Sequence, residues 1–196
     1  MKRKSIAFLV LAAVIGLMSS TSFAQVDYAL GKSYTSNPPI TPTSSWWLGE
    51  DPPWVKFTDG ISAWAWGAVT GWQGSDAVGM TTITIDLGSV KTDIAKVQVD
   101  QFVSTSSAVY ASDSARCLGS TDGTNFTVWG DMTTTGTSSD TETMWYWVYE
   151  TASYKTAQYM MVEMDYASSV GGHKLLSEIW VFSPGATSVK DWSLYR

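Results

Sequence analysis

Short segments in which polar and apolar residues alternate recur along most of the chain. The clearest covers residues 81–87, where Ile83, Ile85 and Leu87 share one side of an extended backbone, because successive side chains of a strand point to opposite faces. Gly88 follows directly and predicts a turn. Further segments of this kind span residues 94–99, 115–119, 126–128, 144–149, 159–164 and 178–182.

Clusters of Gly, Ser, Thr, Asn and Asp separate these segments, and no long stretch has the 3.6-residue period of an amphipathic helix. A strand with one apolar face must bury that face against a second sheet. We therefore expect an all-β, jelly-roll β-sandwich of about eight mainly antiparallel strands. Residues 122–125, with the sequence DGTN, predict a tight hairpin turn, because Gly tolerates positive φ and Asp and Asn bond to nearby backbone.

Three regions do not follow the alternating pattern. Residues 37–53 hold five of the six prolines together with Trp46 and Trp47, which indicates a long loop held by aromatic side chains. Residues 133–143 are rich in Thr, Ser and Gly, a composition typical of a hairpin tip. The segment 184–196 follows the last predicted strand, and we expect it to be either a docked terminal segment or a stub.

The first 24 residues have the layout of a cleaved export signal. Three basic residues at 2–4 precede an apolar stretch at 6–18, and small residues flank position 23. The apolar stretch is shorter than the roughly 20 residues that a transmembrane helix needs, although an uncleaved N-terminal anchor is the alternative. We expect a signal peptide at 1–24, one domain at 25–183 with no transmembrane segment, and a protein that reaches the periplasm or the cell exterior.

The charge balance limits the partners of the exported chain. Without the signal, nine basic residues stand against 18 acidic ones, so the surface would repel nucleic acid and anionic membranes. The 11 tryptophans argue against a disordered chain. Cys117 is the only cysteine, so no intramolecular disulfide can form, and its alternating neighbours predict a buried side chain.

Several short motifs follow one another in a characteristic order: residues 29–32 (ALGK), 57–60 (FTDG), Trp72, 82–88 (TITIDLG), 94–99 (IAKVQV), 120–126 (STDGTNF), 157–162 (AQYMMV) and 176–182 (LSEIWVF). Together they resemble the discoidin family, also called the coagulation factor five/eight C-type domain family, in its bacterial secreted form. Gln158 stands where that family usually has Arg. The resemblance implies a galactose-binding-like sandwich whose loops at one end bind ligand, in bacterial secreted proteins most often a carbohydrate.

The resemblance also implies a structural calcium ion between the Asp-Gly loop and the last strand. Asp59 and Glu178 would be its carboxylate ligands, with backbone carbonyls near Lys56, Ile61 and Leu176. Calcium accepts six to eight oxygens in flexible geometry, so such a mixed set suits it. Ile61 stands where the family often has an acidic or amide residue, which leaves fewer side-chain oxygens. The alternative is that Asp59 only caps a turn and Glu178 lies on an exposed strand edge.

Sugar recognition needs an aromatic plate for the apolar face of a pyranose, flanked by a few polar groups. The candidate ligand-binding residues are Trp46, Trp54, Trp66, Tyr110, Arg116 and His173. The aromatic residues among them could instead close the end of the sandwich, Arg116 could be an outward solubilising charge, and His173 an exposed loop residue. By contrast, Trp145, Trp147 and Trp180 lie in alternating segments, and we expect most of them to be packing residues.

Sequence motifs for catalysis are missing. A single histidine precludes a His-rich metal site, and no nucleophile elbow, phosphate-binding loop or dinucleotide fingerprint is present. Counting carboxylates does not exclude a glycosidase pair, but none sits in a recognisable motif. We expect a non-catalytic carbohydrate-binding module. The alternative is a protein-binding or cell-surface adhesion domain of the same fold; the sequence gives neither the glycan nor the oligomeric state.

Overall fold

The computed structural model describes residues 25–40, 55–62, 69–73, 79–134, 143–167 and 171–185. The strands in these ranges are β1 (Tyr34–Asn37), β2 (Thr70–Gln73), β3 (Met80–Val103), β4 (Ser114–Ser120), β5 (Thr127–Asp131), β6 (Thr133–Thr134), β7 (Thr143–Asp165) and β8 (His173–Phe182). Two short 3-10 helices, η1 (Lys56–Thr58) and η3 (Thr105–Ser107), lie in connections. No helix within the described ranges is long and apolar enough to cross a membrane. The expected signal peptide lies outside them.

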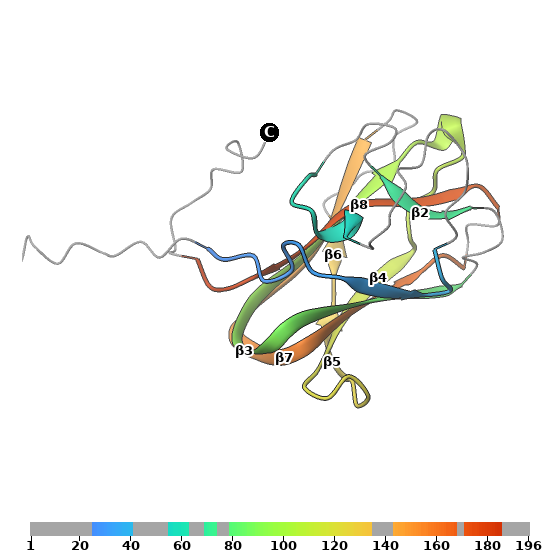
Figure 1. Ribbon diagram of the computed structural model, residues 1–196. Coiled ribbons are helices and arrows are strands. Elements are labelled where there is room, and N and C mark those ends of the chain that lie inside the picture. Colours follow the sequence, from blue (N-terminus) through green and yellow to red (C-terminus); the bar gives the residue numbers. More distant parts are fainter. Residues whose placement is uncertain are drawn as a thin grey trace, which may run out of the picture.

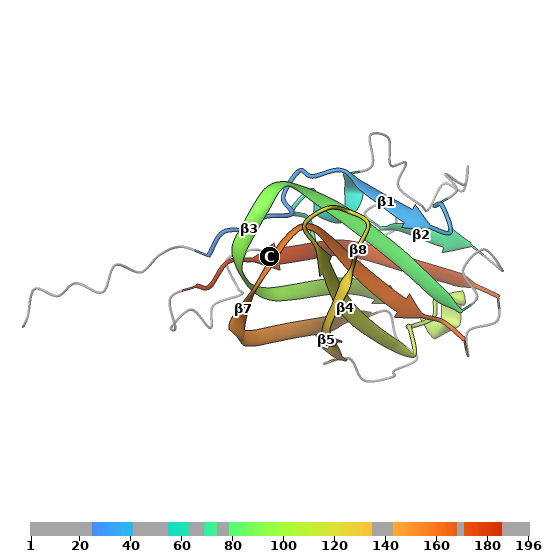
Figure 2. The ribbon, with the colours of Figure 1, turned by 90° about the horizontal axis from the view of Figure 1, so that it is seen from below.

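All strand pairs are antiparallel, and the main path of hydrogen-bonded neighbours runs β2-β8-β3-β7-β4-β5, with β1 added to β3 and β6 added to β7. Two layers face each other across the core (Figures 1 and 2). One contains β1, β4 and β5, and the other contains β2, β6 and β8. This arrangement confirms the predicted all-β sandwich of antiparallel strands.

The long strands β3 and β7 join the two layers, because each runs through both of them. Figures 1 and 2 show the two strands curving side by side from one layer into the other at the same end of the molecule. Their pairing runs from Met80 opposite Asp165 to Val103 opposite Thr143, with register shifts between residues 86 and 96 of β3. The predicted segments 144–149 and 159–164 are therefore parts of one strand.

Gly88 is the point at which the sequence and the structure differ. Its φ of 81° lies in the left-handed region, which glycine adopts without steric cost. That conformation serves a turn or a bend equally well. Pairing with β7 resumes at Lys91 opposite Ala157, so the chain bends rather than turns back. The predicted turn after residue 87 is wrong, and residues 81–87 and 94–99 belong to the single strand β3.

The alternating apolar residues form the core as predicted. From β3, Ile83, Ile85 and Leu87 are at most 1% exposed, and they join one buried cluster with Val99 and Ile179 of the opposite layer. Full burial of an aliphatic side chain of this size contributes about 1.5–3 kcal/mol, so the three residues strongly favour the orientation that places them in the core. The alternation of β3 therefore decides which side of it faces the core.

The predicted packing residues divide between the two faces. Trp147 is buried and donates its indole N–H to Gln101 Oε1 at 3.0 Å, and Trp145 packs against the core while partly exposed. Trp180 lies on the outer face, where its indole donates to Asp100 Oδ2 at 3.0 Å. Cys117 is fully buried, as predicted, and burial raises the pKa of its thiol.

The hairpin between β4 and β5 confirms the predicted turn. Asp122 Oδ1 accepts hydrogen bonds from the Ser120 hydroxyl and from the amides of Thr124 and Asn125, each at 2.8 Å. These bonds favour the ionised carboxylate and hold the pKa of Asp122 well below its ordinary value. Gly123 has a φ of 75°, which a β-branched residue would not adopt without strain.

Candidate functional site

Tyr110 and His173 lie side by side at one end of the sandwich, although they are far apart in the sequence. The connection that leaves β3 through η3 is tied to the start of β8 by two backbone hydrogen bonds. Tyr110 N donates to the His173 carbonyl at 2.9 Å, and His173 N donates to the Ala108 carbonyl at 2.7 Å. Ala108 ends η3 in the left-handed conformation, with a φ of 54°. The structure thus brings two of the predicted ligand-binding residues together.

The ring of Tyr110 lies directly against the backbone of Gly172. A Cβ atom at position 172 would come within 2.5 Å of ring carbon Cε2 and within 2.4 Å of the Ala108 carbonyl oxygen. Only glycine leaves room for this approach. Tyr110 is half-buried, so part of its side chain remains accessible. The loop therefore presents an aromatic side chain on a backbone that is fixed by hydrogen bonds.

His173 is the first residue of β8 and is 8% exposed, so it is not an exposed loop histidine. Burial, with a smaller contribution from the neighbouring Lys174 charge, lowers the pKa of His173. The imidazole is therefore neutral at pH 7. A neutral imidazole carries one donor nitrogen and one acceptor nitrogen, and this one lies beside the Tyr110 loop.

Arg116 occupies a different place from Tyr110 and His173. It lies on β4 opposite Glu163 of β7, and the two side chains form an ion pair through Arg116 Nε and Glu163 Oε2. The Arg116 side chain is 43% exposed, which agrees with an outward-facing charge. No contact within the described ranges joins it to the Tyr110 loop.

Three other predicted aromatic plates, Trp46, Trp54 and Trp66, lie outside the described residues. Their role in ligand binding stays a prediction. Among the predicted aromatic residues, Tyr110 lies in the described part of the chain. It sits in a loop and is partly exposed.

Asp59 and Glu178 meet at the backbone amide of Ile61. Asp59 directly follows helix η1, and Gly60, with a φ of 82°, is in the left-handed conformation. The Ile61 N–H donates to Asp59 Oδ1 at 2.8 Å and to Glu178 Oε2 at 3.3 Å. The Ser177 hydroxyl donates to the Ile61 carbonyl at 3.2 Å and fixes the loop on the strand. The two carboxyl groups predicted as partners are therefore neighbours.

Glu178 is fully buried, and its Oε1 has no hydrogen-bond partner among the described residues. Burial is the main reason that the pKa of Glu178 rises to about 10, and the hydrogen bond and negative charge of Asp59 raise it further. The alternative of an exposed strand edge is therefore wrong for Glu178. The buried Glu178 carboxyl beside the half-buried Asp59 is stable only with a proton or a cation between the two groups.

The pair fits a calcium ion only in part. Within the described ranges, no group of three or more His, Cys, Asp or Glu residues lies close enough to hold a metal ion. A cation here would take two carboxylates and the free Glu178 Oε1, and its remaining oxygens would come from backbone carbonyls and water. The chemistry of this donor set, which is oxygen only, matches calcium rather than zinc or iron.

Asp27 belongs to the same acidic neighbourhood, which sequence reasoning missed. Its Oδ1 accepts hydrogen bonds from the amides of Ala29 and Val181 at 3.0 Å each, so it fastens the N-terminal segment to β8. Its charge adds to the effects that raise the pKa of Glu178. Burial raises the pKa of Asp27 itself. No sequence signal connects Asp27 with Glu178, because the pairing of the N-terminal segment with β8 brings them together.

No protein-family model matches the chain. No curated protein matches it either. Solved structures with a similar fold do match the chain. A CBM32 module of Clostridium perfringens in complex with GalNAc-β-1,3-galactose has a TM-score of 0.53 and 17% identity, covering 81% of this chain and 100% of that one. CBM32-1 of a C. perfringens family 31 glycoside hydrolase has a TM-score of 0.53 and 15% identity, covering 79% and 97%.

A third similar structure is the family 32 carbohydrate-binding module of C. perfringens NanJ in complex with galactose. Its TM-score is 0.51 and its identity 17%, over 81% of this chain and 99% of that one. At such identities the likeness shows the fold. The chain has the same antiparallel β-sandwich fold as these modules, in agreement with the fold that the sequence motifs predict.

Proposed function

We propose that the chain is an exported, non-catalytic carbohydrate-binding module. The observation that carries the proposal is the half-buried Tyr110 ring, held over Gly172 at one end of a fold shared with modules solved in complex with galactose and GalNAc-β-1,3-galactose. The apolar face of a pyranose would stack on this ring, and the neutral His173 would contribute a polar contact. A single partly exposed aromatic ring predicts weak binding. Several copies of the module in one assembly would bind a glycan-covered surface more strongly.

A glycan array followed by isothermal titration tests this proposal. We expect saturable binding that Tyr110→Ala abolishes and Tyr110→Phe keeps, because the plate needs the ring and not the hydroxyl. Tyr154→Ala is the matched control, since Tyr154 is 55% exposed where β7 bends from one layer into the other. Binding that survives Tyr110→Ala in a folded protein would move the site to the predicted Trp46, Trp54 or Trp66. An array without any hit would contradict the function.

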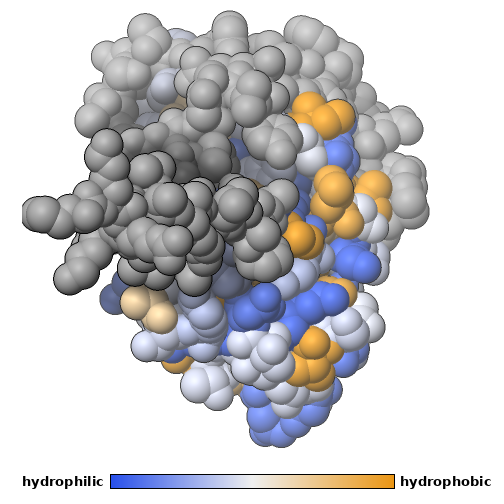
Figure 3. Space-filling view, turned by 90° about the vertical axis from the view of Figure 1, so that its left-hand side faces the viewer, coloured by the Kyte–Doolittle hydropathy of each residue, from blue (hydrophilic) through white to orange (hydrophobic). Residues whose placement is uncertain are grey.

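A protein-binding domain of the same fold is the alternative, and such a domain needs a contiguous apolar patch. The exposed large apolar residues of the described chain are Val26, Leu30, Ile61, Met80, Val90, Val128 and Tyr154. On the face in Figure 3, hydrophobic residues are interspersed with hydrophilic ones. This mixed surface favours the carbohydrate proposal for that face.

We also propose that Asp59 and Glu178 hold a structural calcium ion. The ion would supply positive charge between the buried Glu178 carboxyl and the half-buried Asp59 carboxyl, and the Ile61 loop would thereby be fixed to β8. Calcium should raise the melting temperature of the protein and EDTA should lower it. Glu178→Gln should remove this calcium effect, whereas Asp122→Asn, at an exposed hairpin carboxylate, should keep it. An unchanged melting temperature in millimolar calcium would contradict the site.

A further inference from the structure

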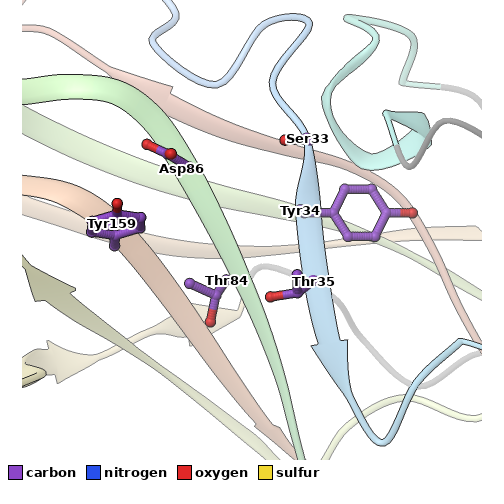
Figure 4. Close-up of a pocket in the computed structure, with 6 residues that line it drawn as sticks. All are labelled: Ser33, Tyr34, Thr35, Thr84, Asp86 and Tyr159. Carbon is purple, nitrogen blue, oxygen red and sulfur yellow. The ribbon is translucent and has the colours of Figure 1, made fainter. Parts of the chain in front are cut away.

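A pocket, here called the face pocket, lies on the outer face of the layer that contains β1, away from the Tyr110 loop. Its volume is about 140 Å³, and Ser33, Tyr34, Thr35, Thr84, Asp86 and Tyr159 line it. Pockets that enclose drug-sized ligands measure roughly 300–1,000 Å³, so this one has room for a single small ring. Figure 4 shows its lining residues on neighbouring strands.

Strand register places the lining side chains on one face. Thr35 of β1 lies opposite Thr84 of β3, and Asp86 of β3 lies opposite Tyr159 of β7. Thr84 and Asp86 alternate with the core residues of β3 and therefore point outward. Tyr34 points the other way (Figure 4) and stacks on Phe57, with the ring centroids 4.6 Å apart. The floor is thus β3, with Thr35 on one side and Tyr159 on the other.

The carboxylate and the phenol are held in position by a shared neighbour. Asp86 Oδ1 accepts hydrogen bonds from Gly88 N at 2.8 Å and from Gln158 Nε2 at 3.3 Å. Gln158 Nε2 also lies 3.2 Å from the Tyr159 hydroxyl, to which it donates. The ring of Tyr159 is supported by Gly123 of the β4–β5 hairpin, at which a Cβ atom would lie 3.2 Å from ring carbon Cε2. Groups fixed in this way lose little entropy when a ligand binds.

Several polar atoms of the pocket remain available to a ligand. Asp86 Oδ2 and the hydroxyls of Thr35 and Thr84 make no hydrogen bond within the residues that the structure describes. A carboxylate oxygen accepts from hydroxyl groups, and a threonine hydroxyl both donates and accepts. None of the six lining residues is basic, so the pocket disfavours anionic ligands such as uronic acids and phosphates.

We propose that this face pocket binds one neutral hexopyranose ring of a glycan, as a second subsite in addition to the one at the Tyr110 end. The ring's hydroxyl groups donate to Asp86 and exchange hydrogen bonds with Thr35 and Thr84, while its apolar face contacts Tyr159. The inference extends the proposed function to a second surface. Two weak sites on one domain let a branched or surface-bound glycan be held at two points, which raises the avidity without a larger pocket.

Nuclear magnetic resonance titration of the purified protein tests the subsite directly. The probes are galactose, GalNAc-β-1,3-galactose and, as the anionic comparison, galacturonic acid. We expect saturable shift changes at the amides of Thr84, Asp86 and Tyr159 with the neutral sugars, and at least several-fold weaker ones with galacturonic acid. Shift changes at Tyr110 and His173 report the other site in the same spectra.

Two pairs of variants separate binding from folding. Tyr159→Ala should weaken binding at the face pocket by roughly three- to tenfold, whereas Tyr159→Phe should keep the ring contact. Thr84→Arg should fill the pocket and abolish its response, whereas Thr82→Arg, on the same face of β3 but outside the lining, should not. Neither pair should change the response at Tyr110.

The outcomes distinguish this inference from the proposed function. Shifts at the Tyr110 end with none at the face pocket would overturn the second subsite and leave the module function intact. Shifts at the face pocket alone would support the subsite and contradict the Tyr110 site. Silence at both sites with all probes would overturn both proposals. Pocket shifts that Thr84→Arg leaves unchanged would show binding elsewhere and would also overturn the subsite.

Discussion

The Tyr110 ring and Gly172 are in contact so close that no side chain fits at position 172. A Cβ atom there would lie 2.5 Å from the ring and 2.4 Å from the Ala108 carbonyl, whereas Gly171, with a φ of 83°, has nothing within 4 Å of its Cβ position. Both adjacent glycines have positive φ values, but only Gly172 has no room for a side chain. They therefore separate the cost of backbone strain from the cost of a clash.

We predict that Gly171→Ala lowers the free energy of unfolding by about 1 kcal/mol, the strain of a left-handed alanine. Gly172→Ala should cost clearly more, because Ala108 and the Tyr110 ring must also move. It should weaken glycan binding at the Tyr110 end as well. Urea denaturation and titration of both variants measure these effects. Equal losses in the two variants would contradict the close contact.

Gln101 is the centre of a buried polar network. Its Nε2 donates to the Tyr166 hydroxyl at 2.9 Å, and its Oε1 accepts from the Trp147 indole at 3.0 Å and from the Ser112 hydroxyl at 3.3 Å. Gln101→Leu should lower the free energy of unfolding by roughly 2–4 kcal/mol, because it leaves buried donors and acceptors unpaired. Chemical denaturation measures the loss. A variant as stable as the parent would show that water replaces these bonds.

Arg116 should contribute little to stability and nothing to the Tyr110 site. Its ion pair with Glu163 is partly exposed, and such pairs contribute about 0–1 kcal/mol. We expect Arg116→Met to change the free energy of unfolding by less than about 1 kcal/mol and to leave glycan affinity unchanged. A marked loss of affinity in titration would support Arg116 as the ligand-binding residue that the sequence predicts.

His173 should make the protein less stable in mild acid. Its pKa in the folded protein is below the ordinary value of about 6.5 that the unfolded chain has, so the unfolded state binds more protons in this range. The contribution is complete above pH 6.5 and is lost as the pH falls through the lower folded value. It is the only histidine, so His173→Gln removes this dependence alone.

Denaturation of the parent and of His173→Gln between pH 7.5 and about 5 measures this difference. The parent should lose stability relative to the variant as the pH falls. Burial also raises the pKa of Asp27, but that carboxyl is present in both proteins and cancels in the comparison. Parallel curves would mean that the imidazole is not shielded from water in the folded state.

The sequence predicted local features well, because each rests on a few adjacent residues. The alternation at 81–87 placed Ile83, Ile85 and Leu87 in the core, and the Asp122 turn formed with its side chain bonded to the following amides. The motif order predicted the sandwich fold. The turn at Gly88 was wrong because positive φ permits either a turn or a bend, and long-range pairing with β7 makes the choice.

The sites depend on register, which the sequence does not show. Asp59 and Glu178 could be predicted as partners only through the resemblance, and nothing in the sequence indicated that Glu178 is fully buried. The face pocket forms because Thr35 meets Thr84 and Asp86 meets Tyr159 across strands that are distant in the chain. In the sequence, the outward-facing residues Thr84 and Asp86 only alternate with core residues, a pattern that any solvated strand shows.

The sequence by itself determined the β-sandwich, the residues that face its core and the acidic character of the chain, because alternation and composition act locally on every strand. Only the tertiary structure decided that Tyr110 lies beside His173, that Arg116 is paired with Glu163 and that Asp86 and Tyr159 share a pocket. The reason is physical: hydrogen-bond register between distant strands fixes these neighbours, and a shift of one residue would move each side chain to the opposite face.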